Sequence, residues 1–256
     1  MKVVFVGAGP GNPDLLTIQA HRLLSHCQIC IYAGSLVSPE VVALTPKGAE
    51  LHDSAGMTLD EMEIVFARAQ ENDIDLIRLH TGDPSIYGAI REQMNSLDKM
   101  GIDYEVVPGV SSFQAAAAAL KTELTAPEIA QTIILSRTSG RTPMPAMQEL
   151  EHLARIQSTL CLFLSVHKID AVAAELAGHY GCDCPAAVVF RASWPDEKLV
   201  QGSLADIAAK VEEAQINKTA MIIVGPALSR DIPVSKLYHR HFSHGYRQSD
   251  SQKDET

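Results

Sequence analysis

The fold can be read outward from residues 77–88, Ile77-Arg78-Leu79-His80-Thr81-Gly82-Asp83-Pro84-Ser85-Ile86-Tyr87-Gly88. The stretch leaves a strand-like run at its carboxyl end and enters a glycine–proline turn, and ligands of open α/β sheets bind at such strand ends. An acidic side chain in the turn can hold a ligand amine or hydroxyl through charge-assisted hydrogen bonds. Asp83 could equally cap the next helix, and the stretch alone leaves both roles open.

Two more loops have the same strand–turn–helix pattern. The first reads Val6-Gly7-Ala8-Gly9-Pro10-Gly11-Asn12-Pro13, and its glycines let a ligand or another backbone segment approach closely. Its end, Asn12-Pro13, suits the N-cap and first turn of a helix. The second reads Val106-Val107-Pro108-Gly109-Val110-Ser111-Ser112, where Ser111 could cap a helix and still contact a ligand.

The glycine-rich loop does not fit a dinucleotide site. Asn12 stands where the third glycine of G-x-G-x-x-G would be, and the second strand ends Ile31-Tyr32-Ala33-Gly34 without the expected acid. No Gly-Lys-Ser/Thr follows the loop, which excludes a Walker A motif. Taken by itself, the loop is either a tight turn or a ligand site.

The whole chain alternates between short β-branched runs and helix-like segments, which is typical of a parallel-rich α/β protein. A helix is expected over 58–70, with Leu59, Met62, Phe66 and Ala69 on one face and Thr58 with Glu61 as a capping box. We expect α/β domains over 1–114 and 120–238, joined near the alanine-rich run 111–119, and a polar, disordered tail over 239–256. The ten expected strands are 2–7, 29–33, 49–53, 75–80, 104–108, 131–136, 159–166, 186–191, 198–202 and 219–225.

Composition narrows the class of protein. A net charge of −10, from 21 basic and 31 acidic residues, lacks the basic footprint of a nucleic-acid binder. No apolar run is long enough for a membrane span, and the apolar start ends at Gly7, so a first strand and a cytoplasmic location are expected. The odd count of five cysteines argues against disulfides; Cys27 and Cys30 are expected to be buried strand residues, and Cys182 with Cys184 lacks the second pair of a zinc site.

The order of the three loops resembles the tetrapyrrole methylase family, whose motifs are GxGPGxxxLLT, GDPxxYG and VPGVSS. The resemblance extends from Lys2 to about Ser229. It implies two α/β domains with a ligand cleft between them, a homodimer, and S-adenosylmethionine as the methyl donor. Carried over by position, the cofactor contacts would be Pro10, Thr81, Gly82, Asp83, Ile86, Ser111, Ser112, Leu164, Ala192 and Ala220.

Further stretches resemble the branch of the family that methylates precorrin-4 or cobalt-precorrin-4 at C-11 in cobalamin biosynthesis. They are 32–37, 123–128, 131–137 and Arg191-Ala192-Ser193-Trp194-Pro195-Asp196-Glu197. Thr81 replaces the first glycine of the GGDP that is typical of uroporphyrinogen-III methylases, which favours the later-acting branch. Whether the substrate already contains cobalt stays open.

The roles of several polar residues follow from this resemblance. Asp83 is expected to position the cofactor's polar atoms and not to act as a base. Arg137 and Arg141 are candidates for binding substrate carboxylates, although a solvated loop explains them equally well. His239, His241 and His244 are expected to bind no metal. The alternatives within this fold are another tetrapyrrole methylase, acting on uroporphyrinogen-III or at another precorrin position, and a methylase of RNA or of a protein side chain. Those from other classes are a nicotinamide-dependent oxidoreductase and a ligand-binding subunit without activity.

Overall fold

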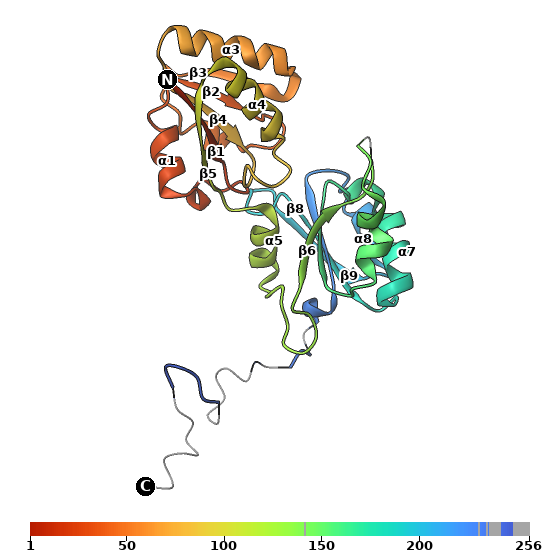
Figure 1. Ribbon diagram of the computed structural model, residues 1–256. Helices are drawn as coiled ribbons and strands as arrows, with labels where there is room; N and C mark the ends of the chain where they lie inside the picture. Colours follow the sequence, from red (N-terminus) through yellow and green to blue (C-terminus); the bar gives the residue numbers. More distant parts are fainter. Residues whose placement is uncertain (141, 230, 234, 236–241, 248–256) are drawn as a thin grey trace, which may run out of the picture. The chain divides into compact units, whose positions relative to one another are not determined.

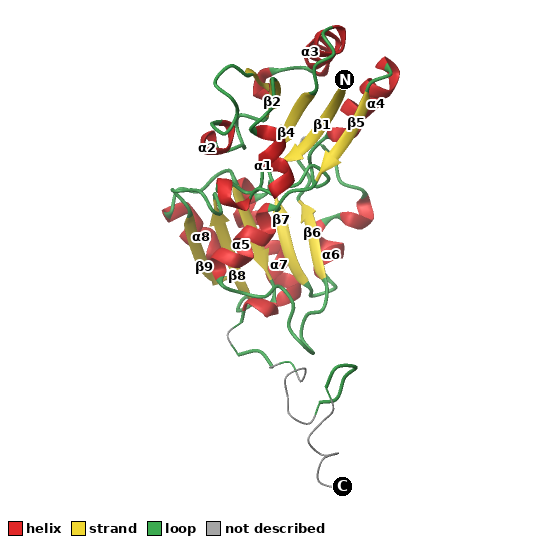
Figure 2. Ribbon diagram, turned by 90° about the vertical axis from the view of Figure 1, so that its left-hand side faces the viewer, coloured by secondary structure: helices red, strands yellow, loops and turns green. Residues whose placement is uncertain are grey.

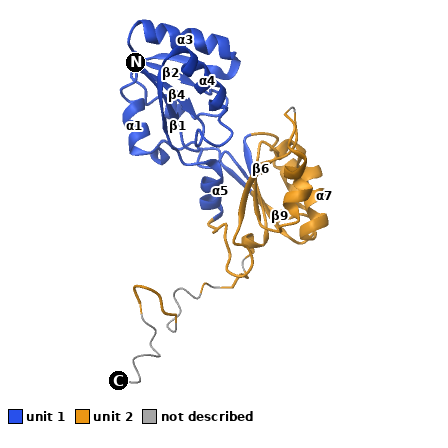
Figure 3. Ribbon diagram, viewed as in Figure 1, with its two compact units in different colours: residues 1–120, 189–199, 219–221 blue, residues 121–188, 200–218, 222–256 orange. Residues whose placement is uncertain are grey.

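The computed structural model describes residues 1–140, 142–229, 231–233, 235 and 242–247, and its elements are labelled in Figure 1. The chain divides into two compact units (Figure 3). Unit 1 comprises Met1–Leu120, Val189–Leu199 and Thr219–Met221, and unit 2 comprises Lys121–Val188, Val200–Lys218 and Ile222–Thr256. Two short segments from the second half of the chain therefore belong to the first compact unit.

Unit 1 contains a five-stranded parallel sheet with the order β3-β2-β4-β1-β5. The expected first five strands are confirmed. They are β1 (Lys2–Gly7), β2 (Ile29–Tyr32), β3 (Glu50–Asp53), β4 (Leu76–His80) and β5 (Asp103–Val107). Because β1 lies between β4 and β5, the loops that follow these three strands leave the same edge of the sheet side by side.

Helices cover both faces of this sheet (Figure 2). One face packs on α1 (Ile18–Leu24) and α2 (Pro39–Val42), and the other on α3 (Leu59–Glu71) and α4 (Ile90–Met100). The expected apolar face of α3 is largely confirmed, since Met62, Phe66 and Ala69 are buried there and Leu59 packs against them partly buried. α5 (Ser112–Leu120) is the expected alanine-rich helix.

Local signals at the helix starts are also confirmed. Thr58 and Glu61 form the capping box of α3. The Asn12 side chain caps Pro13–Leu15, but this is a single 3₁₀ turn and not the α-helix that the residues suggest. The α-helix α1 begins later because Thr17, whose side chain accepts a hydrogen bond from the Ala20 amide, caps it. Cys27 and Cys30 are free and buried, as expected, but only Cys30 lies in a strand, because β2 begins at Ile29 and Cys27 precedes it.

Most of the second sheet, which has the order β6-β7-β10-β8-β9, belongs to unit 2. It is mixed, since β7 pairs with β6 in parallel and with β10 antiparallel. The five expected strands are confirmed as β6 (Ile133–Arg137), β7 (Thr159–Phe163), β8 (Pro185–Phe190), β9 (Lys198–Ser203) and β10 (Ala220–Val224). The α-helices are α6 (Leu150–Ala154), α7 (Ile169–Tyr180) and α8 (Ile207–Glu213), and α7 contacts both others. None of the described helices is long and apolar enough to cross a membrane.

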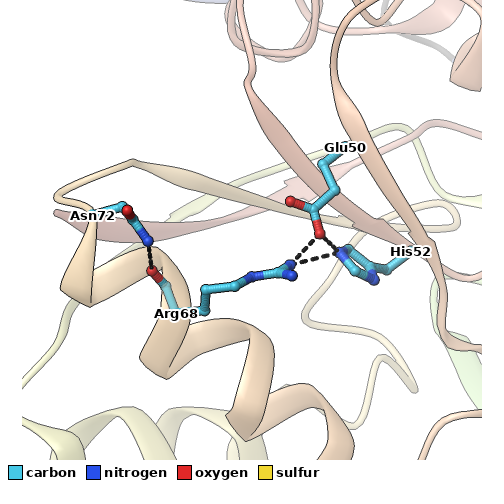
Figure 4. Close-up of polar contacts among 4 residues, drawn as sticks. All are labelled: Glu50, His52, Arg68 and Asn72. Atoms are coloured by element: carbon cyan, nitrogen blue, oxygen red, sulfur yellow. Dashed lines mark hydrogen bonds and ion pairs between the residues drawn. The ribbon is translucent and has the colours of Figure 1, made fainter.

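A polar cluster joins the edge strand β3 to α3 (Figure 4). The Glu50 carboxylate accepts hydrogen bonds from Arg68 and from His52, the latter at 2.6 Å. Burial alone would raise the pKa of Glu50, but the His52 and Arg68 contacts outweigh it and hold the pKa below its ordinary value. The side chains are 23–48% exposed, so solvent screens the cluster.

Replacing Arg68 by alanine should lower the free energy of unfolding by about 0.5 kcal/mol at neutral pH, the usual size of an exposed ion pair. A group with a lowered folded-state pKa stabilises above its unfolded pKa, here 4.5, and loses that contribution as the pH falls through the folded value. Urea titrations of both proteins should therefore converge in acid, and also in about 1 M salt, where the Debye length is short. A difference that persists in acid would assign the effect to packing of the arginine stem.

Candidate functional site

Three loops of unit 1 form the candidate site, and each follows the carboxyl end of a strand. They are the Gly7–Gly11 loop after β1, the Thr81–Gly88 loop after β4 and the Pro108–Ser111 loop after β5. Backbone hydrogen bonds join the first two, since the Ala8 amide donates to His80 O at 2.7 Å. Gly9 and Gly82 pair in both directions, at 3.2 and 2.8 Å, as an isolated bridge.

The glycines at these strand ends allow the loops to pack backbone against backbone. A Cβ atom on Gly109 would lie 2.2 Å from Gly82 O and 2.8 Å from Gly7 Cα. A Cβ on Gly7 would lie 2.6 Å from Gly109 Cα. From the sequence, either a ligand or another backbone segment could have approached Gly7 closely. In the structure, the backbone of Gly109 occupies this space.

Asp83 ties the second loop to the third. Its Oδ2 accepts the Gly109 amide at 2.9 Å, while Oδ1 accepts the amide of Ser85 at 2.8 Å and also the Ser85 hydroxyl. Burial raises the pKa of Asp83, but the hydrogen bonds from Ser85 and Gly109 together lower it by more. The pKa of Asp83 therefore lies below its ordinary value. Asp83 is therefore a carboxylate at neutral pH with three donors already bound, which suits an organising role and opposes a role as a base.

A buried arginine supports the far end of the Thr81–Gly88 loop. Arg78, 5% exposed within β4, donates from Nε to Gln93 Oε1 at 2.9 Å and from Nη1 to the carbonyls of Ile31 and Leu79. The Gln93 amide donates in turn to Ala89 O, where α4 begins. Burial lowers the pKa of Arg78 to about 10, so the guanidinium stays charged without a carboxylate partner in the part of the chain that the structure describes.

His80, at the end of β4, is buried beside this arginine. Burial, together with the positive charge of Arg78, lowers the pKa of His80 to about 3, so its imidazole is neutral. Its Nε2 has no hydrogen-bond partner among the described residues.

Most of the cofactor contacts expected from the resemblance lie in unit 1. Those on the three loops are Pro10, Thr81, Gly82, Asp83, Ile86, Ser111 and Ser112. Ala192 and Ala220 belong to the same unit through its two later segments, which are joined by a 3.0 Å hydrogen bond from the Arg191 amide to Thr219 O. Pro10, Gly82, Ser111 and Ala192 are buried, whereas Thr81, Asp83 and Ser112 are partly exposed.

Leu164 and Arg137 lie in unit 2, where both line a cavity of about 360 Å³. Leu164 is 60% exposed and has a left-handed backbone, with φ at 54°. Arg137 donates from Nη1 to the carbonyls of Thr138 and Thr142 and from Nη2 to Pro143 O, so it also shapes the loop that forms the cavity wall. Arg141 lies outside the described residues.

Of the three histidines that are expected to bind no metal, only His244 lies among the described residues. His239 and His241 lie outside the described residues, and the Nδ1 atom of His244 accepts the Tyr246 amide at 3.2 Å. Among the residues that the structure describes, no three His, Cys, Asp or Glu side chains gather as a metal site would require.

The comparisons with known proteins agree with the order of the loops. The family model described as Tetrapyrrole (Corrin/Porphyrin) Methylases matches residues 2–208. The chain belongs to the tetrapyrrole methylase family. The resemblance expected from the sequence is confirmed, and the oxidoreductase alternative is thereby excluded.

Two curated relatives of this methylase match it over almost their whole length. The cobalt-precorrin-4 C(11)-methyltransferase of Methanocaldococcus jannaschii is 51% identical, over 97% of this chain and 96% of its own. The precorrin-4 C(11)-methyltransferase of Sinorhizobium sp is 47% identical, over 96% and 98%.

Solved structures of the family share the fold of this methylase. A cobalt precorrin-4 methyltransferase superposes with a TM-score of 0.87 at 43% identity, covering 89% of this chain and 96% of the other. The uroporphyrin-III C-methyltransferase of Thermus thermophilus, solved as a complex with S-adenosylhomocysteine, superposes with a TM-score of 0.74 at 29% identity, covering 89% and 99%. The expected fold class of two α/β domains is confirmed.

Proposed function

We propose that this methylase transfers a methyl group from S-adenosylmethionine to C-11 of precorrin-4 or cobalt-precorrin-4 in cobalamin biosynthesis. The observation that carries the proposal is the similarity over almost the full chain to two methyltransferases named for that position. One of these names contains cobalt and the other does not, so the proposal covers both forms of the substrate. A cytoplasmic homodimer is part of the proposal.

We place the cofactor on the strand-end loops of unit 1. Nine of the ten expected contacts belong to that unit, and the loops offer partly exposed hydroxyls and glycine backbone beside a fixed carboxylate. The Nε atom of Arg191, next to Ala192, is buried without an acceptor among the described residues, as a polar ligand would allow. These features fit a charged, polar cofactor.

When bound, the cofactor supplies an electrophilic methyl group on sulfur. The conjugated tetrapyrrole supplies the carbon nucleophile, so the protein needs no strong nucleophile of its own. Its residues mainly hold the two reactants in line, a contribution that can reach about 7–11 kcal/mol of the barrier. A carboxylate such as Asp83, fixed by its own hydrogen bonds, keeps the loops in place without taking a proton.

The decisive experiment is anaerobic incubation of the enzyme with methyl-labelled S-adenosylmethionine and each of the two candidate tetrapyrroles. We expect one label at C-11, located by mass and carbon-label analysis, together with stoichiometric S-adenosylhomocysteine. A label at another carbon would assign the enzyme to a different methylase of the family, and light scattering in the same buffer would test the dimer.

Replacing Arg137 by alanine should raise the KM for the tetrapyrrole about tenfold, the effect of losing one charge-assisted hydrogen bond to a carboxylate. The KM for S-adenosylmethionine should stay unchanged. Arg155, an exposed arginine of the same unit that pairs with Glu151, provides the matched control, since its replacement by alanine removes a similar charge away from the cavity. If Arg137→Ala and Arg141→Ala both leave the tetrapyrrole affinity unchanged, neither arginine binds the substrate.

A further inference from the structure

The segment after β8 makes contacts with the glycine-rich loop that local sequence patterns do not indicate. The indole Nε1 of Trp194 donates a 2.8 Å hydrogen bond to Pro10 O, across 184 positions of the chain. The Asn12 amide donates to Ser193 Oγ at 3.0 Å. All four residues belong to unit 1.

These contacts add to the backbone hydrogen bonds of the loop. Gly9 is already paired with Gly82 in both directions, and Asn12 O accepts the Leu15 amide. Pro10 has no amide hydrogen, so its carbonyl is its one backbone polar group, and Trp194 binds it. The Gly82 loop thus fixes one side of the Gly9–Asn12 backbone, and residues 193–194 fix the other.

Two features require glycine at position 11, its backbone φ of 159° and the ring of the same tryptophan. A Cβ atom there would lie 2.1 Å from Cδ1 and 2.3 Å from Nε1 of the Trp194 ring. The indole therefore occupies the space that any side chain at position 11 would need.

Trp194 is itself held in place. The Arg191 guanidinium lies over the indole ring, 4.8 Å from its centroid, and pairs with Asp196 at 2.6 Å. Arg191 and Ser193 have left-handed backbones, with φ at 45° and 70°. Such conformations cost free energy and persist where the surroundings enforce them, often at functional sites.

We propose that Trp194 is a positioning residue for the cofactor: its indole fixes Pro10 and Gly11 in the conformation that accepts S-adenosylmethionine. The inference rests on the proposed cofactor site in unit 1. Trp194 and Arg191 are only partly buried and Asp196 is exposed, so these contacts add little to the hydrophobic core. Their loss should weaken cofactor binding more than it lowers stability.

The test measures S-adenosylhomocysteine binding by calorimetry, with thermal melting as the folding readout. Trp194→Phe keeps a ring beside Gly11 but removes the N–H group, and we expect about fivefold weaker binding, as for one neutral hydrogen bond. Trp194→Ala removes the ring as well and should bind at least about tenfold more weakly, whereas melting should shift by less than about 3 °C. The kcat of Trp194→Phe at saturating cofactor should stay within about twofold of the wild type, since the indole is not placed at the reacting atoms.

A double-mutant cycle tests the contact at Gly11. Gly11→Ala should bind about 100-fold more weakly, because its Cβ displaces the indole or the loop. The double variant with Trp194→Ala should bind clearly more tightly than Gly11→Ala, since the clash is gone, and the backbone strain at φ 159° should keep it somewhat weaker than Trp194→Ala alone. Gly56→Ala, where a Cβ meets nothing within 4 Å, is the control and should bind normally.

Fluorescence gives an independent reading because Trp194 is the single tryptophan of the chain. Its emission should change in proportion to cofactor saturation. Binding within twofold of the wild type for both Trp194 variants, or a double variant as weak as Gly11→Ala, would overturn the inference while the cofactor site stands. A wild-type protein that binds no S-adenosylhomocysteine would overturn both. If Gly11→Ala does not fold, the Trp194→Phe result decides.

Discussion

Asparagine at position 83 should weaken S-adenosylhomocysteine binding about 100-fold, because a carboxylate that accepts hydrogen bonds on both oxygens would become an amide with one acceptor. Asp83 accepts from Ser85 on Oδ1 and from Gly109 on Oδ2. Whichever way the new amide turns, its NH₂ group faces a backbone N–H. The amide therefore either breaks the bond from Gly109 that links the Thr81–Gly88 and Pro108–Ser111 loops or breaks the turn at Ser85.

Calorimetry and steady-state kinetics would measure the effect. We expect the KM for S-adenosylmethionine to rise with little change in kcat. Ser85→Ala is the graded comparison, since it removes the hydroxyl bond and keeps the Ser85 amide bond, and it should cost about fivefold. A loss of kcat at unchanged cofactor affinity would contradict the organising role and indicate chemistry at Asp83.

The pH dependence separates the two roles further. The folded-state pKa of Asp83 lies below its ordinary 3.8, so the carboxylate's contribution to the loops is present above that value and is lost as the pH falls through the folded pKa. Activity between about pH 6 and pH 9 should therefore show no titration of Asp83. A limb of the wild-type profile in that range that disappears in Asp83→Asn would assign a proton transfer to this residue.

The sequence predicted the strands well because each strand carries its own signal. All ten expected segments became strands, most of them rich in β-branched residues, and glycine or proline turns marked many of their ends. The order of the strands had no such signal: that β1 lies between β4 and β5, which brings the three loops together, follows from packing across the sheet. The antiparallel pairing of β7 with β10 was hidden for the same reason.

The site was predictable in its loops and less so in its contacts. Asp83 stood out as an acid in a turn, and its bond to Ser85 two residues on is a local pattern that the sequence could have shown. Its bond to Gly109 and the bond between Trp194 and Pro10 join distant segments, so no local pattern indicates them. In the sequence, Arg78 is a single polar residue within a strand. No local pattern indicates its partner, because Gln93 lies on the next helix.

Alanine at position 109 should lower the free energy of unfolding by about 3 kcal/mol, at the upper end of what overpacking usually costs, and abolish measurable cofactor binding. The new Cβ would lie 2.2 Å from Gly82 O and 2.8 Å from Gly7 Cα, and neither backbone atom can turn away as a side chain could. The backbone of Gly109 is not in the left-handed region, so the effect is steric and does not arise from an unfavourable φ.

Two other glycines allow urea titrations of single variants to separate the steric cause from an unfavourable backbone conformation. At Gly82, with φ at 61°, a Cβ has ordinary contact distances, so Gly82→Ala should cost only the left-handed conformation, about 1 kcal/mol. At Gly48 a Cβ meets nothing within 4 Å, and Gly48→Ala should be neutral or stabilise by up to about 1 kcal/mol. The expected order of damage is Gly109, then Gly82, then Gly48. If Gly82→Ala proves more harmful than Gly109→Ala, backbone conformation and not loop-to-loop contact determines why glycine stands at these strand ends.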